Sequence, residues 1–288
     1  MKNNFSGIIK KTICLGALMI AIGSDEALSS PRDLLNPPPH LFVLQTVPDS
    51  KTFGVDIEEQ EENIGPFLDI RFNALKETGL SYGARGGLAY RTYEIRRQLE
   101  DRADHLDKIY DFGRLLLPAP GGLLLEAPVV TEAENALVIN GDGQEAAMTD
   151  LVFQINKNSR IVTAPRHWRE YLERTWGDME PPPDILRPSN REERDVWEDA
   201  LKEGWAAGEA QADEIFQRDL GELVSDFEGM IRYHRLVALG MISKPFTLQE
   251  DRGITGGGDE MEIGHRAIKI TGKPELIPGH EQWLPANR

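Results

Sequence analysis

Four polar residues near the carboxyl end of the chain have types and spacing suited to chemistry: Asp259, Glu260, Glu262 and His265. Carboxylates and an imidazole this close in sequence can ligate a metal ion or act as an acid and base pair. In a strand-and-turn setting, however, neighbouring side chains point in different directions. A solvated hairpin turn is therefore the leading interpretation, and a metal-dependent hydrolase is the alternative.

Other catalytic patterns are missing from the sequence. The six histidines are widely separated, and no His-Glu-x-x-His motif occurs. Residues 79–83 match the letters Gly-x-Ser-x-Gly but follow no predicted strand, so no nucleophile elbow is expected there. The single cysteine, Cys14, lies inside an N-terminal segment that we expect to be removed, which excludes a thiol nucleophile and disulfides from the mature chain. We therefore predict no enzyme activity, no catalytic residue, no bound metal and no cofactor.

A glycine-rich stretch contains Gly83, Gly86 and Gly87 around Arg85. Each glycine weakens a helix by roughly 1 kcal/mol relative to alanine, so either a turn with positive φ or a close backbone approach must require them. An arginine before a helix start also resembles a phosphate cradle. No lysine-serine or lysine-threonine pair follows, and no buried strand precedes the stretch, so we do not expect nucleotide binding.

The longest periodic pattern covers residues 189–241, where apolar side chains recur every three to five positions. Ser189 or Asn190 can cap its start, acidic residues fill the first turn, and proline is absent before Pro245. We predict one long helix, or two nearly collinear ones, as the spine of a domain. Gly204 and Gly208 lie four apart on it beside Trp205, which favours internal packing over a partner helix.

The remaining patterns divide into blocks. Residues 67–76, 88–110 and 165–176 are helical in period. Strands are expected at 123–130, 135–139, 149–155 and 160–163, and again at 246–250, 261–263 and 266–271. Because turns separate neighbouring strands and no crossover helix joins them, the pairing should be antiparallel. The chain is predicted to be α+β, with long helices packed on an antiparallel sheet of hairpins.

The first residues are typical of a secretory signal. Lys2, Lys10 and Lys11 precede an apolar run at 13–23, which is too short to span a bilayer. Cleavage before Ser24 would export the mature chain to a periplasm-like space. Cys14 lies at the start of the apolar run instead of after it, so we do not expect it to be lipidated.

Three parts follow from these patterns: a signal peptide at 1–23, a flexible proline-rich and acidic arm at 24–64, and a single α+β domain at 65–288. The arm is either a plain linker or a peptide that docks on a neighbour through Leu41, Phe42, Val43 and Leu44. The formal net charge of the chain is -16, and no basic patch is visible in the sequence. A direct nucleic-acid surface is therefore not expected.

Several blocks, taken in order, carry a family resemblance. They are Tyr82-Gly83-Ala84-Arg85-Gly86-Gly87-Leu88-Ala89-Tyr90-Arg91, Gly204-Trp205-x-x-Gly208-x-x-Gln211-Ala212, Arg218-Asp219-Leu220, Asp226-Phe227-x-Gly229-Met230-x-Arg232-Tyr233, Gly253-x-Thr255-Gly256-Gly257-Gly258-x-x-Met261 and Ile268-x-Ile270-Thr271. The region from 65 to 285 resembles the DotC family of Dot/Icm, or type IVB, secretion systems and related conjugation systems. Family members are described as lipoproteins, so the position of Cys14 is a departure: the anchor is lost, the start is misplaced, or neighbouring subunits hold this one at the membrane.

The resemblance implies a periplasmic, outer-membrane-associated structural subunit of a secretion core complex. It implies a small DotD-like lipoprotein and a DotH-like subunit as partners in a homo-oligomeric ring, and it brings no catalytic residues. Candidate interface residues are Tyr82, Arg85, Gly86, Gly87, Arg91, Gly204, Trp205, Gly208, Gly256 and Gly257. The alternatives are the metal-dependent hydrolase named above and a soluble ligand-binding protein of the envelope.

Overall fold

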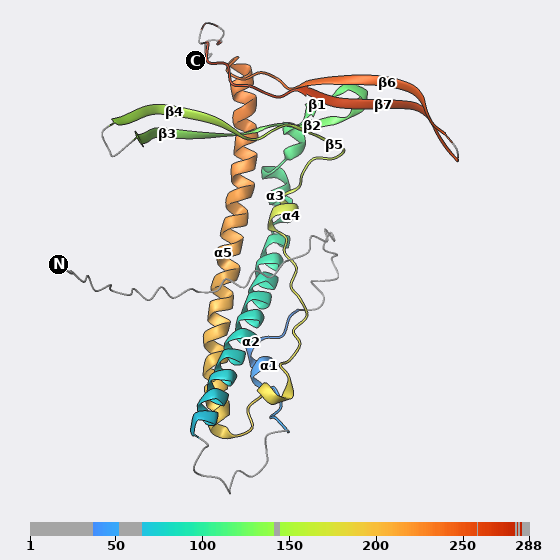
Figure 1. Cartoon of the computed structure of the whole chain (residues 1–288). Helices are drawn as coiled ribbons and strands as arrows, with labels where there is room; N and C mark the ends of the chain where they lie inside the picture. The colour runs from blue at the N-terminus through green and yellow to red at the C-terminus, as the bar shows by residue number, and fades with distance from the viewer. Residues whose placement is uncertain are drawn as a thin grey trace, which may run out of the picture.

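A computed structural model describes residues 37–51, 65–140, 145–257, 259–279, 281 and 283 of the chain. The predicted signal peptide with Cys14, and residues 24–36 and 52–64 of the predicted arm, lie outside the described residues. Figure 1 shows a tall pair of helices with two β-hairpins that extend in opposite directions near the top.

The longest helix, α5, runs from Arg191 to Ala238 and spans about 72 Å at 1.5 Å per residue. The side chain of Asn190 accepts a hydrogen bond from the Glu193 amide at its start. At its end, Gly240 adopts a φ of 73° and two backbone hydrogen bonds close the last turn. The predicted helix at 189–241 is confirmed as a single element, with one of the two predicted capping residues, Asn190, at its start.

The second long helix, α2, covers Gly65–Glu100 without interruption, and the short helix α3 follows at Ala103–Ile109. The sequence predicted separate helices at 67–76 and 88–110 with the glycine-rich stretch between them. That division is wrong, and of the two explanations for the glycines the close backbone approach is confirmed.

Helices α2 and α5 lie side by side and run in the same direction (Figure 1). Two ion pairs set their alignment: Arg71 with Glu193 and Arg91 with Asp213, both 122 residues apart. Because two helices joined by a short loop must run antiparallel, this parallel pairing needs a long connection. The chain between them climbs to the hairpins and then returns along the helices to the start of α5.

Glycine allows the two helices to touch backbone to backbone. A Cβ atom added to Gly83 would lie 2.3 Å from the Leu201 carbonyl oxygen, and one added to Gly87 would lie 2.2 Å from that of Trp205. From the other side, a Cβ on Gly208 would lie 2.1 Å from the carbonyl oxygen of Ala84. The prediction that Gly204 and Gly208 serve internal packing is thus confirmed, with α2 as the helix they contact.

The ion pair between Arg71 and Glu193 ties the lower ends of α2 and α5 together. Arg71 donates from Nε to Glu193 Oε1 at 2.6 Å and from Nη2 to Oε2 at 2.9 Å, and Ser189 donates to the same carboxylate from its amide and its hydroxyl. Burial favours a raised pKa for Glu193, but these hydrogen bonds outweigh it and lower the pKa below its ordinary value. The carboxylate therefore stays charged in the folded chain.

Residues 37–51 pack on the helix pair, so the linker interpretation does not hold for this part of the predicted arm. Helix α1, Leu41–Gln45, buries Leu44 at 1% exposure against Gly86 and the α5 aromatic residue Trp205. Phe42 and Val43 face outward at 70% and 55% exposure. The predicted docking peptide thus contacts its own chain through Leu44, while two of its other members remain exposed.

The strands form three separate antiparallel sheets in the described part of the chain, which confirms the α+β class but not one common sheet. The smallest joins β1 (Leu117–Pro118), β2 (Leu124–Glu126) and β5 (Arg160–Val162). The two hairpins are β3 (Val129–Asn140) with β4 (Glu145–Lys157), and β6 (Phe246–Gly257) with β7 (Glu260–Gly272). Both hairpins are longer than the strand patterns predicted.

The main core lies where the upper part of α5 meets the hairpin bases. The short elements η2 (Phe112–Leu115) and α4 (Trp168–Leu172) pack against this core, η3 (Pro120–Gly122) lies beside β6, and η4 (Asp184–Leu186) lies lower on the return path. The fully buried residues of the main core include Val130, Trp168, Leu223 and Tyr233. Among the described helices, none combines the length and apolar composition that a membrane span requires.

Candidate functional site

The acidic cluster singled out for chemistry falls on the β6–β7 hairpin. Asp259 lies in the turn, and His265 lies on β7 opposite Gly253, half-buried. The side chains of Glu260 and Glu262 lie outside the described residues. Among described residues, no group of three or more histidine, cysteine, aspartate or glutamate side chains could hold a metal ion.

Most of the predicted interface residues lie on the α2–α5 pair. Tyr82, Gly86, Gly87, Gly204, Trp205 and Gly208 are buried within the chain. Arg85 is exposed over the ring of Tyr82, Arg91 pairs with Asp213 and Glu94, and Gly256 and Gly257 are exposed near the β6–β7 turn. Their contact with other subunits stays a prediction, and within this chain the buried glycines have a packing role.

A cluster of charges around three buried carboxylates, which sequence patterns did not identify, joins the β3–β4 hairpin and α4 to α5. We refer to it as the junction cluster. Its members are Glu126, Lys157, Arg160, Arg166, Tyr171, Arg174, Arg218, Asp219 and Asp226. They come from β2, β4, β5, α4, α5 and the segments beside α4, so only the tertiary fold brings them together.

Asp226 is the centre of the junction cluster, with a side chain only 3% exposed. Its Oδ2 atom accepts hydrogen bonds from Lys157 Nζ at 2.8 Å, from Arg166 Nη1 at 3.0 Å and from the Tyr171 hydroxyl at 2.8 Å. Three donors on one buried carboxylate offset its loss of hydration. Asp226 thus connects the end of β4, the loop before α4 and α4 itself to one position on α5.

Two more buried carboxylates complete the cluster. Glu126 pairs with Arg160 and with Arg166. Asp219 accepts two hydrogen bonds from Arg174, at 2.8 and 3.0 Å, and two from Arg218, at 3.1 and 3.4 Å. A cavity of about 230 Å³ lies over these groups, lined largely by arginine, tyrosine and acidic side chains.

The protonation states agree with a permanent ion network. Burial raises the pKa of the Tyr171 hydroxyl well above its ordinary value, and the bonds with Arg166 and Asp226 lower and raise it in turn. Burial lowers the pKa of Lys157, but hydrogen bonds to Asp226 and Glu222 outweigh this effect and raise it. At neutral pH the tyrosine is therefore a donor and the lysine is charged.

The arrangement does not resemble a reacting centre. A general base or nucleophile needs an accessible lone pair, and the three buried carboxylates are each held by two or more cationic or hydroxyl donors. Their chemistry is that of a mechanical clamp. These bonds hold the end of β4, the loop before α4 and α4 itself against α5.

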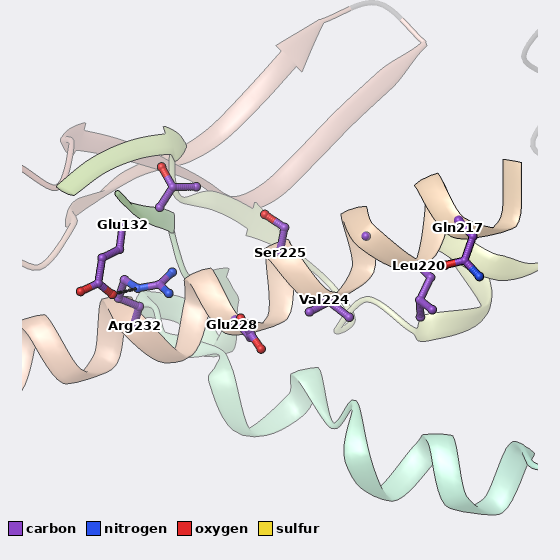
Figure 2. A pocket seen from close by; sticks show the side chains of 9 residues that line it. Glu132, Gln217, Leu220, Val224, Ser225, Glu228 and Arg232 are labelled. Atoms are coloured by element: carbon purple, nitrogen blue, oxygen red, sulfur yellow. Dashed lines mark hydrogen bonds and ion pairs between the residues drawn. The ribbon is translucent and has the colours of Figure 1, made fainter. Parts of the chain in front are cut away.

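A groove of about 460 Å³ runs between β3 and the outer face of α5, as Figure 2 shows. Arg232 closes one end by bonding Glu132 through Nε at 2.8 Å and the Val130 carbonyl oxygen through Nη1 at 2.8 Å, and Gln217 lies at the other end. Its wall is mixed: Thr131, Leu220, Gly221, Val224, Ser225 and Glu228 complete it. The same arginine thereby fastens the hairpin base to α5 a second time.

One sequence signal could have revealed the junction cluster. Positions 219, 223, 226, 230 and 233 of α5 are all buried, at spacings of four and three. Asp219 and Asp226 thus occupy two positions of an otherwise apolar stripe, where an acid requires a buried partner. The sequence could not name the partners, which come from four other segments.

Comparison with known proteins gave one family. The family model described as "Type IV secretory system, conjugal DNA-protein transfer" matches residues 69–285. The matched region begins near the start of α2 and extends beyond β7, so it includes the helix pair, the junction cluster and both hairpins. A search of curated proteins gave no match.

Proposed function

Because the chain belongs to the type IV secretory system, conjugal DNA-protein transfer family, we propose that it is a structural subunit of a secretion or conjugation core complex. The observation that carries the proposal is the shape of the matched region. A stiff helix pair bears two long hairpins, and neither hairpin is covered along its length by other described elements (Figure 1). Such exposed hairpins suit contact with neighbouring subunits better than containment of a substrate.

The internal bonding of the chain supports a scaffold. Direct contact between the α2 and α5 backbones at Gly83, Gly87, Gly204 and Gly208 resists sliding, because a shift along the axis would bring residues with a Cβ atom against the facing backbone. The junction cluster and Arg232 hold the base of the β3–β4 hairpin at several points. A subunit that fixes distances inside a large assembly needs this kind of rigidity.

The resemblance to the DotC family makes the proposal more specific. We place the subunit in the periplasm, associated with the outer membrane of a type IVB system, where it assembles with DotD-like and DotH-like subunits. Export by the predicted signal peptide leads to this compartment. Partners that carry a lipid anchor would hold the subunit at the membrane without lipidation of Cys14.

The test is affinity purification of the tagged full chain from membranes in mild detergent, followed by mass spectrometry of the complex and of the N-terminus of the chain. Co-purification of outer-membrane core subunits is expected. An unrelated exported protein with the same tag is the control. Recovery as a lone soluble monomer from cells that express the complete system would refute the scaffold function.

The same preparation tests the enzyme alternative. A metal-dependent hydrolase would retain a stoichiometric metal ion, detected by elemental analysis, and would lose it on substitution of Glu262→Ala with His265→Ala. The proposal expects no bound metal and no change on this substitution.

A further inference from the structure

The two hairpins are matched in length and project in opposite directions from the same region of the molecule. β3 and β6 contain 12 residues each, and β4 and β7 contain 13 each. At about 3.3 Å per residue each hairpin extends roughly 40 Å. Figure 1 shows them as two arms on either side of α5.

Each arm has the features of an unfinished sheet. A two-stranded ribbon is marginally stable in water on its own, and its outer edges carry unpaired backbone groups. On the β6–β7 arm, Ile254 and Ile263 form a cross-strand pair with 66% and 74% of their surface exposed, and Met261 beside them is 65% exposed. On the β3–β4 arm, Leu151 and Val152 are exposed on opposite faces.

The charges of the two arms are complementary in a specific order. The outer part of the β3–β4 arm, residues 134–151, contains four acidic residues and no basic one. The base of the β6–β7 arm, residues 244–252 and 265–273, contains five lysines and arginines against two acids. The acidic half is at the tip of one arm and the basic half is at the root of the other.

We propose that the β3–β4 arm of one copy of this chain lies along the β6–β7 arm of a second copy, tip to root, to form a shared antiparallel sheet. This inference rests on the proposed scaffold function and deepens it by naming the two surfaces through which neighbouring copies of the chain meet. Because the arms point oppositely on each copy, one contact leaves a free arm on both outer sides. The contact is therefore head-to-tail and repeats from copy to copy.

The tip-to-root orientation brings the acidic outer part of one arm against the basic base of the other, whereas a tip-to-tip orientation would bring acidic residues of both arms together. Near the middle of the overlap the tip-to-root orientation places Glu134 and Asp150 of one copy close to Arg266 and Lys269 of the next, and these four side chains are exposed within a single chain. Edge-to-edge pairing supplies backbone hydrogen bonds along the arms, and burial of the exposed apolar pairs adds to it. Complementary charge then selects the partner and the orientation.

A charge-swap experiment on the full chain in mild detergent tests the contact. Sedimentation velocity over a range of concentrations is expected to show species larger than a dimer. Reversal of the root charges by Arg266→Glu with Lys269→Glu should raise the dissociation constant at least tenfold. Adding Glu134→Lys with Asp150→Lys to the same chain should restore at least half of the lost affinity on a logarithmic scale.

The matched control is Lys76→Glu with Lys202→Glu, which makes the same change in net charge on exposed positions of α2 and α5. It should leave the dissociation constant within twofold. A second measurement uses chains that carry Cys14→Ser and either Asp150→Cys or Lys269→Cys, each with a different tag. A flexible bismaleimide should crosslink a chain with Asp150→Cys to a chain with Lys269→Cys more often than it crosslinks two chains that carry the same substitution.

Three results would overturn the contact: a wild-type chain that stays monomeric, a root reversal no more harmful than the control, or a reversal that the acidic-to-basic swap does not rescue. Co-purification of the other core subunits is recorded for every variant. Its retention in those cases leaves the scaffold function intact while the contact between copies fails. Its loss in the wild-type chain refutes the scaffold function itself.

Discussion

Replacing Gly208 with alanine should destabilise the chain, although alanine is the better helix former. The added Cβ atom would lie 2.1 Å from the Ala84 carbonyl oxygen and 2.7 Å from the Leu88 amide nitrogen. Both neighbours are backbone atoms of α2, which cannot turn away as a side chain does. The helices must separate locally, and the contacts around the substitution are lost.

A second glycine of α5 provides the matched comparison. Gly221 is exposed, and nothing lies within 4 Å of an added Cβ atom. Gly221→Ala should therefore gain the helix-propensity difference of about 1 kcal/mol. Gly208→Ala gains the same amount in helix propensity but is destabilised by overpacking. Overpacking typically costs about 1–3 kcal/mol, and we expect about 3 kcal/mol here because the contact is with backbone atoms.

The difference between the two variants isolates the overpacking cost, because the propensity gain cancels. Urea unfolding of the full chain, followed by far-ultraviolet circular dichroism, should give free energies of unfolding that differ by about 3 kcal/mol between Gly221→Ala and Gly208→Ala. The first variant should lie above the wild type and the second below it. Equal stabilisation by both would refute the direct contact between α2 and α5.

Three further results are expected from the same unfolding assay. Asp226→Asn should cost about 3 kcal/mol because it removes a carboxylate, only 3% exposed, that holds both Lys157 and Arg166, whereas Glu222→Gln, at a side chain that is 59% exposed, should cost less than about 1 kcal/mol. Leu44→Ala should lower the free energy of unfolding by about 2–5 kcal/mol, because Leu44 is buried. Phe42→Ala should change it by no more than about 0.5 kcal/mol, because Phe42 is exposed. The pKa of Glu193 is lower in the folded chain than its ordinary value of 4.5, so the charged carboxylate stabilises the fold at pH values above 4.5 and this stabilisation is lost as the pH falls through the folded pKa. In a plot of the free energy of unfolding against pH, Glu193→Gln should therefore reduce the slope on the acid side.

Failure of these expectations would be informative in different ways. Equal losses for the Asp226 and Glu222 variants would mean that the junction cluster is not a buried clamp. If Leu44→Ala left the free energy of unfolding unchanged, the packing of α1 on the helix pair would be contradicted. If the Glu193 variant kept the same dependence of unfolding free energy on acid pH as the wild type, the ion pair between Arg71 and Glu193 would not contribute to the alignment of α2 with α5.

Some of the fold could be predicted because its causes are local. Helix α5 has a capping residue, acids in its first turn, an apolar stripe and a glycine at its end, all within one segment. The hairpins are marked by alternating patterns and by Gly141-Asp142-Gly143 or Gly256-Gly257-Gly258 between them. These signals also establish the α+β class, since no helix separates the paired strands.

The meaning of the glycine-rich stretch in α2 could not be read from its own sequence. Three glycines destabilise an isolated helix, so the local pattern predicted an interruption. In the fold, Gly83 and Gly87 leave room for the backbone of α5, which lies more than a hundred residues further along the chain. The contact between the two helices compensates for the low helix propensity of these glycines. The parallel direction of the two helices was equally hidden, because it depends on the path of the whole connecting chain.

The junction cluster shows the same division between local and distant causes. The sequence places Asp219 and Asp226 on the buried stripe of α5, because helical periodicity determines which face each residue occupies. Only the tertiary structure brings Lys157, Arg166 and Tyr171 from separate segments onto one of those carboxylates. Periodicity reports which face of an element is buried, whereas the partner that satisfies a buried charge is selected by packing between segments distant in sequence.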